Sequence, residues 1–120
     1  MTLPVNFANR DVFWPGSAQA KSLLCDILHK DFTRAGLDFE FEPAGQDDFL
    51  EELYRYLLLN LNRTISANPS KLRALLYLVD IREDKLISHS GGPFFPLEKL
   101  CEEIIKREIK KVYFRISLQG

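Results

Sequence analysis

The chain has 120 residues, 46% of them hydrophobic and 28% charged, which is the composition of a single globular domain rather than of a disordered segment. Its 16 Lys and Arg nearly balance its 17 Asp and Glu, so no overall charge attracts nucleic acid, and the longest apolar run, residues 74–79, is far too short to span a membrane. Two cysteines are too few for a disulfide scaffold, and the first residues lack a basic and then apolar leader, so we expect a cytoplasmic protein.

Residues 1–16 are predicted to form an irregular arm ahead of a helical body, residues 17–120. Phe7, Phe13 and Trp14 stand among prolines and asparagines in this arm. Free tails seldom carry so many large apolar groups. We therefore expect the arm to pack against the body, within one domain that spans residues 1–120.

A first helix is predicted from Ser17, a good N-cap after Pro-Gly, to Gly36, a natural C-terminal stop. Its apolar residues recur at helical spacing on one face: Ala20, Leu24, Ile27, Leu28 and Phe32. Residues 37–42 then alternate apolar and acidic side chains, the period of a strand with one buried face. No partner strand is obvious, so an extended connector remains the alternative.

A second helix is predicted over about residues 47–61, capped by Asp47 or Asp48. Leucines and aromatic residues form a broad apolar face along it. Tyr56 and Leu59 fall outside that face. The helix is thus apolar on more than one side, which predicts a central position in a bundle or a place in an interface.

Asn68-Pro69 predicts the start of a third helix, with Asn at the N-cap and Pro in the first turn. Asp80, with Glu83 three residues later, predicts a further short turn through Leu86. Residues 87–96 are predicted to form a loop, and the adjacent pair Phe94 and Phe95 lies near its end. Paired phenylalanines need cover, so this is a candidate contact loop, although packing onto the protein itself is the favoured outcome.

A fourth helix is predicted from Pro96 or Leu97, with an apolar stripe that reaches Val112. Residues 112–116 are β-branched and aromatic, which is also typical of a short strand. Such a strand would pair with residues 37–42, and the pairing would place the bases near the end of the chain beside the acids of that segment. A continuous helix is the favoured alternative.

The two halves of the chain differ in charge. Residues 1–60 carry 5 Lys and Arg against 10 Asp and Glu, and residues 61–120 carry 11 against 7, so the halves sum to −5 and +4. The acids gather in residues 38–52 and the bases in residues 106–115. We expect these segments to attract each other, within a subunit or between subunits.

No motif in the sequence specifies a cofactor, a metal or a catalytic centre. Cys25, His29, His89 and Cys101 would complete a zinc-ligand set, but they lack the tight paired spacing of zinc modules. We interpret them as two buried cysteines and two surface histidines. The bases of residues 106–115 share their predicted helix with Glu98, Glu102, Glu103 and Glu108, which favours a solvated helix face over a nucleic-acid site.

Short motifs in the C-terminal half carry one resemblance: Asn68-Pro69, Lys71-Leu72, Leu75-Leu76-Tyr77, Asp80-Ile81, Glu83-Asp84-Lys85, Ile104-Ile105, Arg107-Glu108 and Lys110-Lys111. This series resembles a pattern in a family of small uncharacterised bacterial helical proteins. Leu78 stands where that family carries Arg, and the first 45 residues match none of its motifs. The resemblance implies a bacterial cytosolic protein and supplies no activity.

The sequence predicts a mainly α fold: about four helices, an aromatic N-terminal arm and at most a minor β element. The function it favours is that of a non-enzymatic protein–protein interaction module or small adaptor, with a homodimer as one form of the assembly, and with no metal and no cofactor. The candidate partner-binding residues are Tyr56, Leu59, Phe94 and Phe95. The alternative is an enzyme or small-molecule-binding protein with a pocket between the arm, the second helix and the Phe94-Phe95 loop.

Overall fold

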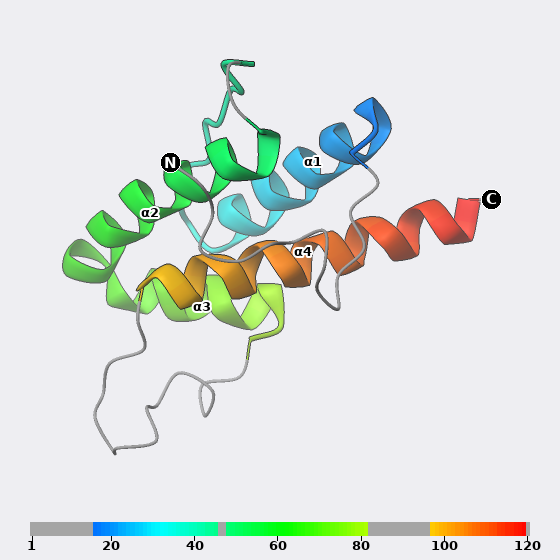
Figure 1. The fold of residues 1–120 in the computed structure, drawn as a ribbon. Helices are drawn as coiled ribbons and strands as arrows, with labels where there is room; N and C mark the ends of the chain where they lie inside the picture. Colours follow the sequence, from blue (N-terminus) through cyan, green and yellow to red (C-terminus); the bar gives the residue numbers. More distant parts are fainter. Residues whose placement is uncertain (1–15, 46–47, 82–96, 120) are drawn as a thin grey trace.

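The computed structural model describes residues 16–45, 48–81 and 97–119, which form four helices around a shared core (Figure 1). The helices are α1 (Ala18–Arg34), α2 (Phe49–Ala67), α3 (Pro69–Val79) and α4 (Leu97–Gln119). No strand occurs among these residues, which confirms the mainly α prediction. Most of the arm and the whole Phe94-Phe95 loop lie outside the described residues.

Two of the predicted helix starts are fixed by side-chain caps. Ser17 Oγ accepts a hydrogen bond from the backbone N–H of Ala20 at 3.1 Å. Asp48 Oδ1 accepts from the N–H groups of Leu50 and Glu51 at 2.9 and 3.3 Å. These bonds satisfy amides of the first turn that have no partner within the helix. The N-caps Ser17 and Asp48 are therefore confirmed.

The second helix is longer than predicted, because α2 continues past Leu61 to Ala67. Two polar side chains in its second half bond back to the preceding turn. Asn60 Nδ2 donates to the Tyr56 carbonyl, and Thr64 Oγ1 donates to the Asn60 carbonyl, each at 2.9 Å. Polar residues that resemble a loop in the sequence thus remain helical by satisfying their hydrogen bonds on the helix itself.

Asp80 ends α3 instead of opening a further turn, which corrects the prediction for this residue. Its φ of 70° lies in the left-handed region, where non-glycine residues are uncommon. The N–H of Ile81 donates to the Leu76 carbonyl at 2.8 Å, as in a helix that terminates through a left-handed residue. The rest of the expected turn lies outside the described residues.

Helix α4 packs against α1, α2 and α3, and α3 in turn packs against α1 and α2 (Figure 1). The inner face of α4 supplies Leu100, Cys101, Ile104, Ile105, Ile109 and Val112 to the core, all less than 5% exposed. The helix is continuous through residues 112–116, so the short strand considered there does not form. In Figure 1 its C-terminal turns, coloured red, extend beyond the end of α3.

Residues 37–45, which we call the connector, join α1 to α2 without a strand partner in the described chain. Their side chains nevertheless alternate as predicted: Phe39 is buried and Phe41 half-buried, whereas Asp38, Glu40 and Glu42 are exposed. The Phe39 ring lies 5.1 Å from that of Phe32 in α1. The connector is therefore held by side-chain packing rather than by a β ladder.

Across the described residues, no helix combines the length and the apolar character that crossing a membrane requires.

Candidate functional site

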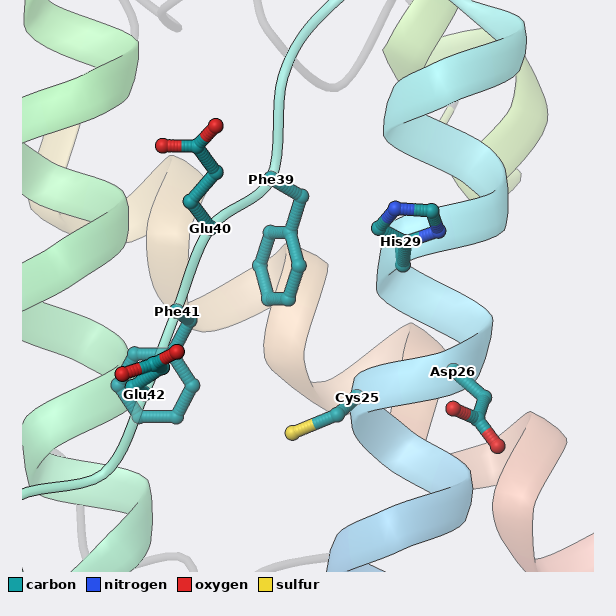
Figure 2. Close-up of a pocket in the computed structure, with 7 residues that line it drawn as sticks. All are labelled: Cys25, Asp26, His29, Phe39, Glu40, Phe41 and Glu42. Carbon is teal, nitrogen blue, oxygen red and sulfur yellow. The ribbon is translucent and has the colours of Figure 1, made fainter.

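A groove runs between α1 and the connector, with a volume of about 630 Å³. Cys25, Asp26 and His29 line it from α1, and residues 39–42 line it from the connector (Figure 2). Figure 2 shows the Cys25 thiol pointing from α1 toward the connector, with the Phe39 ring in the space between the two segments. The predicted pair Cys25 and His29 therefore shares one side of α1, as its spacing requires.

The groove does not assemble a catalytic or metal-binding set from the described residues. Burial, followed by the nearby charge of Asp26, raises the pKa of the Cys25 thiol, so the reactive thiolate is disfavoured. Asp26 points away from the connector, and Glu40 points toward the α2 side (Figure 2). No group of three metal-ligating side chains occurs in the described ranges, and His89 lies outside them.

Cys101, the other cysteine of the considered zinc set, is fully buried in the core. Burial raises the pKa of its thiol to about 12, with smaller contributions from Glu98 and Glu102. A buried, protonated thiol behaves as a small apolar side chain. Both cysteines are free of disulfide bonds.

Tyr56, a predicted partner-binding residue, is covered within the subunit by the connector. Its hydroxyl oxygen accepts a hydrogen bond from the backbone N–H of Glu40 at 2.6 Å. Its ring centroid lies 5.3 Å from that of Phe39 and 5.4 Å from that of Phe41. The apolar side chain that falls outside the α2 stripe thus anchors the connector, a role that the sequence analysis did not consider.

Leu59, the second predicted residue on α2, remains 64% exposed. Phe94 and Phe95 lie outside the described residues. Of the four predicted partner-binding residues, the structure therefore places Tyr56 and Leu59 alone. On α2, Ile65 is a second exposed large apolar residue, at 42% exposure, and lies further along the helix than Leu59.

A larger apolar surface, which the sequence analysis missed, lies on the C-terminal half of α4. Tyr113, Phe114 and Leu118 are 52%, 62% and 87% exposed, and the two aromatic rings pack edge to face with centroids 6.0 Å apart. These residues share one side of the helix with exposed Lys110 and Ser117, opposite buried Val112. We call Lys110, Tyr113, Phe114, Ser117 and Leu118 the outer face of α4. Their i, i+3, i+4 spacing was the signal for this face.

Charged residues also lie on the inner side of α4. Glu108 is fully buried, and half-buried Lys111 lies one turn further along. Lys111 Nζ is 2.8 Å from Asp31 Oδ2 of α1 and 3.0 Å from Glu108 Oε1. It also donates a hydrogen bond of 2.9 Å to the carbonyl of Leu78, near the C-terminal end of α3. We call Asp31, Glu108 and Lys111, with the Leu78 carbonyl, the buried charge cluster.

The environment of the buried charge cluster shifts its titration. Burial raises the pKa of Glu108 to about 8; hydrogen bonding to Asp31 and its charge act in the same direction, and Lys111 opposes them. Burial lowers the pKa of Lys111, but its hydrogen bond to Asp31 and its contact with Glu108 outweigh burial, so the pKa is raised. The lysine therefore stays charged, whereas Glu108 favours its protonated form.

Among the described residues, the basic segment forms ion pairs with acids that lie outside the acidic segment. The base Lys111 pairs with Asp31 of α1, which lies before the acidic segment. Arg107 lies 3.9 Å from Asp80 at the end of α3. Exposed Asp38, Glu40 and Glu42 form no ion pair with the described bases of α4.

Comparisons of this chain with protein-family models, with curated proteins and with solved structures find no significant match.

Proposed function

We propose that this protein is a non-enzymatic protein–protein interaction module that binds through the outer face of α4. The observation that supports this proposal is the exposure of Tyr113, Phe114 and Leu118 on a helix whose opposite face already fills the core. Burying each such side chain in an interface yields about 1.5–3 kcal/mol. A surface of this kind is typical of a site that is covered in a complex.

The partner that fits best is a second copy of the chain. Exposed Lys110 and Arg115 accompany the apolar residues of α4, and the exposed carboxylates of the connector carry the opposite charge. In a two-fold dimer, one contact is repeated by symmetry, so each copy offers both its acids and its bases. Attraction of this kind speeds association and weakens as salt is added. We also propose a cytoplasmic location, consistent with the two free cysteines.

Light scattering at micromolar concentration and low salt tests this function. We expect a dimer that Phe114→Ser dissociates into a folded monomer, with the melting temperature lowered only by the loss of the dimer contacts. Tyr77→Ser is the matched control, because Tyr77 is an 84% exposed aromatic residue on a different helix, α3. This variant should remain dimeric.

Two results would contradict the proposal. A monomeric wild-type protein at low salt would exclude self-association. A dimer that Leu59→Glu dissociates and Phe114→Ser does not would assign the interface to α2, where the sequence analysis placed it.

A second candidate function, binding of a small molecule, is favoured by the groove between α1 and the connector. Its volume of about 630 Å³ lies within the range of small-molecule sites. Half-buried Cys25 and Phe41 provide apolar lining. Thermal shift measurements with a panel of small aromatic compounds test this function. Stabilisation that disappears in Cys25→Phe, which fills the groove, would support it.

A further inference from the structure

The buried charge cluster contains more negative than positive charge. Two carboxyl groups, Asp31 at 6% exposure and Glu108 at 0%, face the single ammonium group of Lys111. The Leu78 carbonyl adds the negative end of the α3 dipole. With both carboxyl groups ionised, the cluster would hold one uncompensated negative charge in the core, which is strongly unfavourable.

The hydrogen bonding around Glu108 points to the same imbalance. An ionised carboxylate accepts hydrogen bonds at both oxygens, but neither oxygen of buried Glu108 receives one. Oε1 lies 3.0 Å from Lys111 Nζ, an ion-pair contact without hydrogen-bond geometry. Lys111 instead donates to Asp31 and to Leu78. Asp31 and Glu108 both contact the Lys111 ammonium, at 2.8 and 3.0 Å, so two carboxyl groups share one positive charge, and a proton on Glu108 removes the repulsion between them.

We propose that one proton, held by Glu108 against Asp31, belongs to the folded structure, so that the packing of α4 on α1 and α3 weakens as the pH rises. Three helices supply the polar groups around Glu108. Helix α1 contributes the Asp31 carboxylate, α3 the Leu78 carbonyl, and α4 the Lys111 ammonium. No charged group of α2 among the described residues contributes to the environment of Glu108, although α2 also packs on α4.

The direction of the pH effect follows from where the proton is bound. The pKa of Glu108 rises from an ordinary value of 4.5 to about 8 on folding. Between these two values the folded state holds a proton that the unfolded state has released. The stabilisation that this proton provides is therefore fully present below the pKa of Glu108 in the unfolded state. It is lost as the pH rises toward the pKa of Glu108 in the folded state. Within this window the equilibrium constant for folding decreases by up to about tenfold per pH unit.

Urea unfolding between pH 5 and pH 9 tests this proposal with the variant Glu108→Gln. Glutamine has the shape of a protonated glutamic acid, does not titrate, and can donate a hydrogen bond to Asp31. We expect the stability of the wild-type protein to fall steeply with pH and that of Glu108→Gln to fall much less. Glu103→Gln is the matched control, because Glu103 is on the same helix but half-exposed, 3.8 Å from Lys106. It should retain the wild-type slope.

The proposal would be overturned if the free energy of unfolding had the same dependence on pH in the wild-type protein and in Glu108→Gln. If Glu108→Gln does not fold, carbon NMR of the wild-type carboxyl groups decides. A midpoint for Glu108 above pH 6.5 supports the proposal, and a midpoint below pH 5 overturns it. Every protein in these measurements carries Phe114→Ser, and 'wild-type' here means that residue 108 is unchanged. The proposed self-association then cannot contribute to the pH dependence.

Discussion

The two faces of α4 depart from an ordinary amphipathic helix in opposite ways. The inner face carries Glu108 and Lys111 within an apolar stripe, and the outer face carries Tyr113, Phe114 and Leu118 in solvent. The inner charges meet partners from α1 and α3. The outer apolar groups remain more than half exposed. The inner face is thus completed within the fold, whereas the outer face is the one that we propose a second molecule covers.

The two faces also differ in what they contribute energetically. A buried ion pair adds little net stability relative to apolar residues of the same volume, although breaking it is destabilising. The buried charge cluster therefore contributes mainly to the specific arrangement of α1, α3 and α4. The outer apolar side chains, which are more than half exposed, contribute less to the stability of a single subunit than buried ones do, and their burial in a complex would be favourable.

The largest expected effect on the free energy of unfolding comes from shortening one aliphatic side chain on each face. Ile104→Ala should lower the free energy of unfolding by about 3 kcal/mol, because it leaves a cavity in the core. Leu118→Ala should change it by less than about 0.5 kcal/mol. Urea unfolding of a monomeric sample measures both values. Similar losses in the two variants would show that the outer face is packed within the subunit.

The next effect tests the inner charges. Lys111→Met should lower the free energy of unfolding by about 3 kcal/mol at pH 7, the lower end of the range for a broken buried pair, because the Lys111 side chain is 35% exposed. Asp31 would then lose its counter-ion, and the Leu78 carbonyl its donor. Lys110→Met, on the outer face, is the control and should be nearly neutral. Equal effects would contradict a special role for the inner lysine.

The smallest effect concerns the end of α3 on which Lys111 docks. Asp80→Gly should raise the free energy of unfolding by about 0.5 kcal/mol, because glycine adopts the left-handed conformation without strain. The contact between Asp80 and Arg107, at 3.9 Å with the Asp80 side chain 83% exposed, contributes little. Asp80→Ala retains the strain and should be less stable than Asp80→Gly. The reverse order of these variants in thermal unfolding would exclude strain at this position.

Features encoded by short stretches of sequence were predictable. Ser17 and Asp48 cap helices through bonds to amides two or three residues away, and the alternation of the connector marks which of its side chains are buried. The helix stripes predicted the core for the same reason. The length of α2 was not predictable, because Asn60 and Thr64 resemble loop residues until their hydrogen bonds to the helix are seen.

The candidate sites were harder to predict, because they depend on contacts between distant residues. Asp31 and Lys111 are 80 positions apart, so nothing near either residue indicates their pairing. Tyr56 was identified as outside its stripe, but its role required the position of Glu40 on the connector. Tyr113 and Phe114 were interpreted as a tendency toward a strand, because their own propensities dominated the helical spacing that links them to Leu118.

The hydrogen bond from Lys111 to Leu78 makes the structure sensitive to the number of residues in α3. One residue inserted into α3 would rotate the following carbonyls by about 100° and move them by about 1.5 Å along the helix axis. The carbonyl that meets Lys111 would then point elsewhere, while the ammonium would remain fixed by Asp31. Substitutions on the exposed side of α3 are therefore compatible with this fold, whereas insertions and deletions between Pro69 and Val79 are not.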